Sequence, residues 1–120
     1  MDVIDSKIVG THDGFNIEAY LTPDLETTVE GDGDYTDEEI RAYRNGDWSF
    51  VNVLVTASKS GTELGSANLG ACQYGAFPGV SGWVSPLNGT GDDFINGYGP
   101  DLISEAVAEA KEQLGKITSR

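Results

Sequence analysis

The sequence predicts a small α+β domain: an antiparallel sheet of about four strands, built from two hairpins, with a short helix and a C-terminal amphipathic helix packed on it. Two pairs of apolar runs, each joined by a short turn, indicate the hairpins. Apolar side chains at helical spacing near the C-terminus indicate the long helix. With 120 residues there is room for one hydrophobic core, so we expect a single domain over residues 1–120.

The first hairpin is predicted over residues 7–12 and 15–21, joined by the turn-forming pair Asp13-Gly14. Apolar and polar side chains alternate in the second of these runs, so we expect one of its faces to be buried. The run Thr36-Asp-Glu-Glu39 then fits a capping box, because a threonine is followed three residues later by a glutamate. It predicts a short helix that ends at Asn45-Gly46.

Residues 48–57 form the clearest predicted strand. Both alternating sets of its side chains are largely apolar, which predicts an interior strand covered on both faces. A turn over residues 58–61 leads into a second strand from residue 62 to about residue 74. Three glycines interrupt this second strand and indicate bulges or the close approach of another element. They are Gly65, Gly70 and Gly75.

Residues 75–99 show neither a strand period nor a helical period. A loop of this length is either functional or contains a short edge strand, which we expect near Trp83. The C-terminal helix carries an apolar stripe over residues 102–114, with Pro100 in its first turn and Gly115 as its predicted cap. Small residues in the stripe should let this helix lie close to the sheet.

Acidity is the main feature of the composition. Twenty carboxylates against seven Lys and Arg residues give a net charge of −13 and an isoelectric point near 4.1. Such a chain lacks the cations that replace phosphate counterions, so we expect no direct binding to nucleic acid. The same charge opposes docking on anionic lipid surfaces. Charged partners of this protein should therefore be basic.

The expected location is the cytoplasm of a host cell. No apolar run approaches the roughly 20 residues that a membrane span needs. The N-terminal residues also lack the basic and apolar segments of an export signal. Cys72 is the single cysteine, which suits a reducing compartment.

The carboxylates are concentrated in one stretch. Residues 1–47 hold 13 acidic and 3 basic side chains, whereas residues 48–120 hold 7 and 4. Residues 24–39 carry eight carboxylates and no cation, a concentration that solubility alone does not require. We interpret these residues, together with the aromatic side chain in the long loop, as a candidate partner-binding surface. The candidate residues are Asp24, Glu26, Glu30, Asp32, Asp34, Asp37, Glu38, Glu39 and Trp83.

Motifs for catalysis and metal binding do not fit the sequence. His12 is the single histidine and lies beside a turn, and Cys72 lies among small residues of a predicted strand, where a buried thiol is expected. A calcium loop starting at Asp32 needs glycine at its sixth position and glutamate at its twelfth. Those positions hold Asp37 and Tyr43. We therefore expect a protein that is not an enzyme and that uses no cofactor.

Three segments resemble small uncharacterised acidic proteins of phages and plasmids. They are NGDWSFVNV (residues 45–53), SGTELGSANL (residues 60–69) and the start of the terminal helix, DLISEAV (residues 101–107). The resemblance implies a protein of a mobile element. It brings no functional motif that could be assigned to particular residues here.

The leading hypothesis is protein binding. The chain would inhibit or modulate a basic, nucleic-acid-handling host protein, presenting carboxylates in place of phosphates as a DNA mimic of an anti-defence type. One alternative is an accessory or structural phage-type protein whose acidity serves solvation only. A second alternative is a small-molecule or cation-binding domain that uses the loop over residues 75–99.

Overall fold

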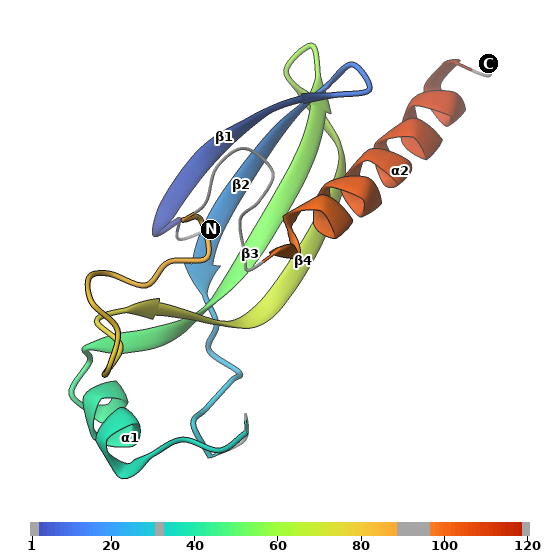
Figure 1. The fold of residues 1–120 in the computed structure, drawn as a ribbon. Coiled ribbons are helices and arrows are strands. Elements are labelled where there is room, and N and C mark those ends of the chain that lie inside the picture. Colours follow the sequence, from blue (N-terminus) through green and yellow to red (C-terminus); the bar gives the residue numbers. More distant parts are fainter. Residues whose placement is uncertain (1–2, 31–32, 89–96, 119–120) are drawn as a thin grey trace.

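The computed structural model of the chain describes residues 3–30, 33–88 and 97–118, and it confirms the predicted α+β class. Its four strands form one sheet. Figure 1 shows that the sheet is twisted, with a long helix across it and a short helix at the far end of the molecule. In chain order the elements are β1 (Asp5–His12), β2 (Phe15–Pro23), α1 (Asp37–Arg44), β3 (Trp48–Lys59), β4 (Thr62–Gly75) and α2 (Gly99–Thr118).

The sheet is antiparallel throughout, with the strand order β1-β2-β3-β4. Both hairpins are therefore confirmed. Each turn uses two residues in the left-handed region: Asp13 (φ 52°) and Gly14 (φ 86°), then Ser60 (φ 54°) and Gly61 (φ 80°). Such pairs match the twist of the strands they join. The second turn is shorter than the predicted one because β3 continues to Lys59.

Helix α2 covers one face of the sheet and makes the main core with it. The core is formed by the inward side chains of β2 and β3 and by the apolar stripe of α2. The helix crosses closest to β4 at Gly65. A Cβ atom at this position would overlap the carbonyl oxygen of Ala106 and lie 2.6 Å from the backbone nitrogen of Ala110. The predicted close approach is confirmed: a glycine in the strand and alanines in the helix allow it.

The expectation that β3 is covered on both faces is wrong for the middle of the strand. Val51, Val53 and Val55 are fully buried beneath α2. On the opposite face Leu54 remains partly exposed. On that face the second core covers the start of the strand around Trp48, and Thr56 is buried further along. An apolar side chain can thus fit the alternating pattern of a strand and still lie on a face that no other element covers.

Gly115 does not end α2, which also corrects the prediction. The helix continues to Thr118, and Gly115 has no positive φ of the kind that a left-handed cap requires. Open space surrounds the position. A glycine caps a helix by adopting the left-handed conformation, and Gly115 keeps a helical one.

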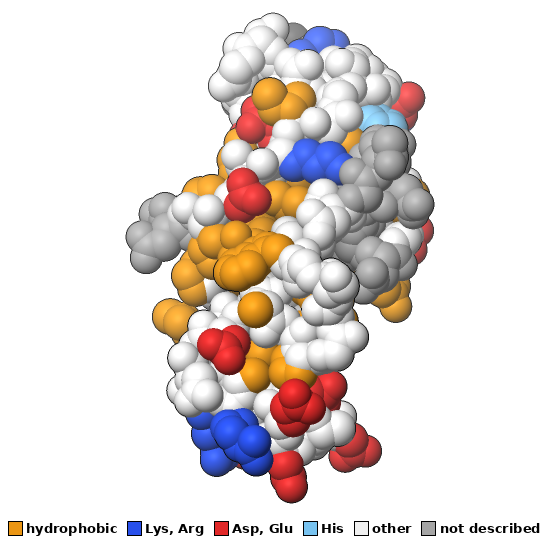
Figure 2. Space-filling model, turned by 60° about the vertical axis from the view of Figure 1, so that its left-hand side comes forward, with side chains coloured by type: hydrophobic (Ala, Val, Ile, Leu, Met, Phe, Trp, Pro, Cys, Tyr) orange, Lys and Arg blue, Asp and Glu red, His pale blue; other side chains and the backbone are white. Residues whose placement is uncertain are grey.

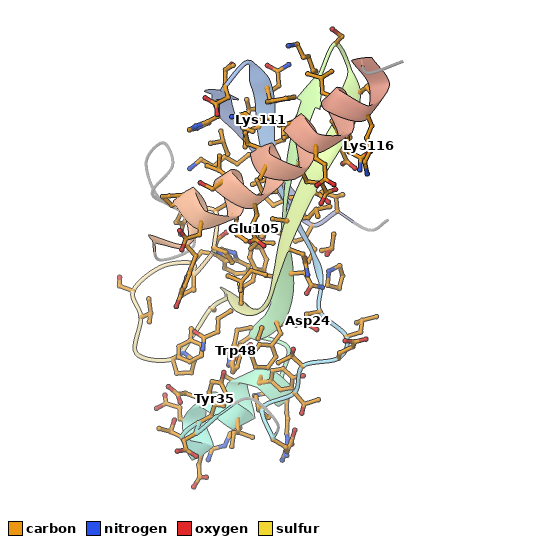
Figure 3. The ribbon with its side chains drawn as sticks, turned by 90° about the vertical axis from the view of Figure 1, so that its right-hand side faces the viewer. Asp24, Tyr35, Trp48, Glu105, Lys111 and Lys116 are labelled. Carbon is orange, nitrogen blue, oxygen red and sulfur yellow. The ribbon has the colours of Figure 1, made fainter. Side chains whose placement is uncertain are left out.

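A second core lies at the α1 end. Trp48, which is 1% exposed, forms it with Phe50, Val29 and Ala42. The Trp48 ring lies 5.1 Å from Tyr43, 5.5 Å from Tyr35 and 4.9 Å from Phe77, measured between ring centroids. Figure 3 shows this cluster at the opposite end from α2, in a molecule measuring 57 × 27 × 22 Å. Strand β3 contributes to both cores.

Replacing Gly65 by alanine should destabilise the protein by about 2–3 kcal/mol, because the new methyl group meets backbone atoms of α2 that cannot rotate away. Chemical denaturation followed by circular dichroism measures the change. The matched control is Gly115→Ala, also a glycine-to-alanine change, which has open space around it and should stabilise α2 by up to about 1 kcal/mol. Equal stability of Gly65→Ala and the parent would contradict the close packing.

Candidate partner-binding site

Asp24 has a structural role in the acidic stretch. Its Oδ2 accepts hydrogen bonds from the Thr27 hydroxyl at 2.6 Å and from the Ala71 backbone N–H at 2.9 Å. Ala71 belongs to the irregular part of β4 near Gly70, where the register shifts and φ is 58°. The bonds from Thr27, Ala71 and nearby backbone N–H groups hold the pKa of Asp24 below its ordinary value. Asp24 thus ties the end of β2 to the bulge in β4.

Two more of the candidate carboxylates have partners within the chain. Glu30 accepts a hydrogen bond from the Arg44 guanidinium at 2.8 Å, which lowers the pKa of this exposed glutamate. Glu39 completes the capping box predicted from the sequence: its side chain accepts from the Thr36 N–H at 2.8 Å, and the Thr36 hydroxyl accepts from the Glu39 N–H at 3.2 Å. These carboxylates help to fold and hold α1.

Four candidate carboxylates are exposed and have no ion pair within the described part of the chain: Glu26, Asp34, Asp37 and Glu38. Asp32 lies outside the described residues. The α1 end is not purely acidic, because Arg41 and Arg44 occupy the last turn of the helix. Figure 2 shows cations and carboxylates side by side at this lower end of the molecule.

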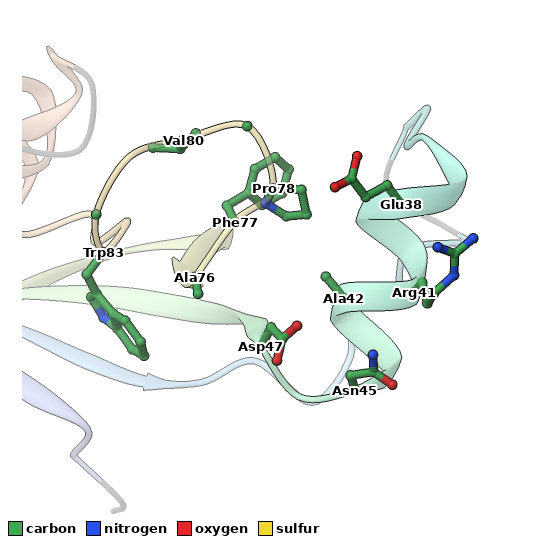
Figure 4. Close-up of a pocket in the computed structure, with 12 residues that line it drawn as sticks. Glu38, Arg41, Ala42, Asn45, Asp47, Ala76, Phe77, Pro78, Val80 and Trp83 are labelled. Carbon is green, nitrogen blue, oxygen red and sulfur yellow. The ribbon is translucent and has the colours of Figure 1, made fainter.

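A cleft of about 730 Å³ separates α1 from the loop over residues 76–83 (Figure 4). Glu38 lines one side of it and Trp83 the other. The structure thereby brings the acidic stretch and the loop aromatic, which are 45 positions apart in the chain, to one site. Sequence reasoning missed Asp47, Phe77 and Val80 as parts of this site.

Backbone hydrogen bonds fix both walls of the cleft. The Asp47 N–H donates to the Ala42 carbonyl at 2.9 Å, and the Asp47 carbonyl accepts from the Ala76 N–H at 2.8 Å. Gly75 and Val84 exchange two further bonds, of 2.9 and 2.8 Å, which form one isolated bridge beside Trp83 and not the short edge strand expected there. A Cβ atom on Gly75 would lie 2.5 Å from the Asp47 carbonyl oxygen, so glycine is required where the loop leaves the sheet.

Apolar side chains of the loop face solvent at the cleft. Trp83 is 58% exposed and Val80 is 50% exposed. The edge-to-face contact between Trp83 and Tyr74, at 5.5 Å and 85°, orients the indole without covering it. Exposed aromatic surface beside charged groups is typical of protein-interaction sites.

Comparison with known proteins and a search for common types of site give no function for the chain. No family model, curated protein or solved structure matches it. The described residues contain no group of three or more His, Cys, Asp or Glu side chains arranged to hold a metal ion. Within the same ranges, neither helix is both long and apolar enough to cross a membrane.

Cys72 is half-buried beside a hollow of about 380 Å³, and its thiol donates to the Leu69 and Gly70 carbonyls.

Asp24→Asn should lower stability at neutral pH by about 1 kcal/mol, because the amide keeps one acceptor oxygen and its NH₂ group cannot accept the bonds made to the other. The pKa of Asp24 is lowered on folding, so its contribution is complete above the unfolded pKa and is lost as pH falls through the folded pKa. The acid limb of a stability–pH profile should therefore be shallower in the variant.

The matched control is Asp13→Asn. This change removes an exposed ion pair with Lys111, at 2.7 Å, and keeps a residue type that tolerates positive φ. It should change stability less than Asp24→Asn does. Parallel profiles for the parent and Asp24→Asn below pH 5 would show that Asp24 does not hold the two strands together.

Proposed function

We propose that this protein is a non-catalytic binding protein that takes a basic partner at its α1 end and thereby modulates a nucleic-acid-handling host protein. The observation that carries the proposal is the cleft. Two exposed carboxylates, which have no ion pair among the described residues, and an exposed tryptophan line it on a backbone held by hydrogen bonds. Charge attracts and orients a basic partner, while the aromatic surface supplies contact area on docking.

Surfaces that handle nucleic acid are a suitable complement. They carry Lys and Arg residues that replace phosphate counterions, so a chain of net charge −13 is attracted to them over long range. The fixed walls of the cleft reduce the ordering cost that a flexible acidic tail would incur on binding. On this proposal the protein belongs to a mobile element and acts in the cytoplasm of its host.

Mimicry of nucleic acid would be local. A DNA duplex as long as this molecule, 57 Å, carries roughly 34 phosphate charges at one per ~1.7 Å. The whole chain has a net charge of −13, and two arginines lie in the last turn of α1. The carboxylates of the α1 end can therefore replace a few phosphates of a bound strand, and the contacts of Trp83 and Val80 must supply the rest of the affinity.

Neutralising Asp34→Asn, Asp37→Asn and Glu38→Gln together should weaken partner binding about tenfold at low salt, chiefly through the association rate. Asp24, Glu30 and Glu39 stay unchanged because they have partners within the fold. The partner is captured from host lysate on the immobilised protein and eluted with rising salt. Its binding kinetics are then measured by biolayer interferometry.

The matched control removes the same charge elsewhere, with Asp101→Asn, Glu105→Gln and Glu109→Gln, which are exposed on α2 and have no ion pair among the described residues. It should leave affinity nearly unchanged. Equal weakening by both triple variants would favour an acidity that serves solvation and non-specific attraction. Simultaneous binding of nucleic acid and this protein to the captured partner would contradict mimicry.

A further inference from the structure

The cleft has a preferred position for a positive charge. Asp47 is exposed, and within the described ranges its carboxylate has no ion pair. Its backbone is held from both sides, by Ala42 and by Ala76, so the carboxylate projects from a fixed point. Figure 4 shows Asp47 on the floor of the cleft, between Trp83 and α1.

The α1 side of the cleft is less attractive to a cation. Glu38 and Arg41 both line it, three positions apart on one helix, and their opposite charges offset each other. Asp47 supplies the remaining negative charge among the charged side chains that line the cleft. A cation entering the cleft is therefore attracted toward Asp47 and away from Arg41.

Trp83 lines the side of the cleft that lies away from α1, with Asp47 between the two (Figure 4). Its indole contacts Tyr74 edge-to-face at 5.5 Å and is otherwise 58% exposed, so aromatic surface remains for a ligand. A cation above an indole face is stabilised by the ring quadrupole. Among the cationic side chains, arginine combines a plane that stacks on an indole with a fork of N–H donors that fits a carboxylate.

Resting on the proposed function, we infer that the cleft receives an arginine side chain of the basic partner, stacked on Trp83 with its guanidinium paired to Asp47. The cleft of about 730 Å³ is larger than one side chain needs, so flanking residues of the partner contact Val80 and Phe77. Arginine is common at basic surfaces that bind phosphates, which links this site to the same class of partner.

The test uses three pentapeptides with blocked termini, Gly-Gly-X-Gly-Gly, in which X is arginine, lysine or citrulline. Titrations are followed by the two tryptophan indole N–H signals in NMR spectra. The arginine peptide should shift the Trp83 signal. Trp48 serves as an internal control, because it is buried and its N–H donates to the Glu39 carbonyl at 3.0 Å. Lysine should bind about threefold more weakly, and neutral citrulline should cause no comparable shift.

Asp47→Asn should weaken the arginine peptide about threefold or more, whereas Glu105→Gln, the same loss of charge on α2, should not. Because Trp83→Leu removes the indole signal, titrations of this variant are followed by the backbone amide signal of Val84. The variant should bind the arginine and lysine peptides with equal affinity. The inference is overturned if citrulline matches arginine, if lysine matches arginine, or if Asp47→Asn changes nothing. Loss of partner binding in the α1 triple variant and in Trp83→Leu, but not in Asp47→Asn, would retain the proposed function and reject the pairing of an arginine with Asp47.

Discussion

Strand β3 contributes side chains to the hydrophobic cores at both ends of the molecule. β3 places Val51, Val53 and Val55 in the core beneath α2, and nearer its start, on the other face, it places Trp48 and Phe50 in the second core. The Trp48 ring touches aromatic side chains from the α1 side and from the loop side. This buried indole and the backbone of Asp47 give α1 and the loop over residues 76–83 a common support.

The walls of the candidate cleft are held in place by that arrangement. Its floor at Asp47 directly precedes Trp48, and one wall follows Gly75 at the end of β4. The other wall is α1, which is held by its capping box and by the hydrogen bond from the Trp48 indole N–H. The two carboxylates that line the cleft, those of Glu38 and Asp47, have no ion pair within the described residues. Exposed apolar surface beside them is costly in water and becomes favourable when a partner covers it.

Local signals in the sequence were sufficient for the elements but not for the site. The Asp13-Gly14 turn, the Thr36–Glu39 capping box and the close approach at Gly65 each depend on a few neighbouring residues or on the absence of a side chain, and each was predicted. The uncovered middle of β3, the extension of α2 past Gly115 and the meeting of Glu38 with Trp83 depend on tertiary packing. Asp47 belongs to no recognisable sequence motif. Its position in the cleft follows from the backbone hydrogen bonds to Ala42 and Ala76.

Native-state hydrogen exchange tests most directly whether β3 joins the two cores. The exchange rate of the Trp48 indole N–H is compared with the rates of the backbone amides of Val53 and Val55. If β3 joins two cores into one cooperative unit, the indole proton should exchange with nearly the same free energy of opening as those amides, since its release requires global unfolding. An indole proton that exchanges by a local opening of much lower free energy would contradict the account. In that case the α1 end would open independently of the sheet, and the cleft would not be fixed before a partner binds.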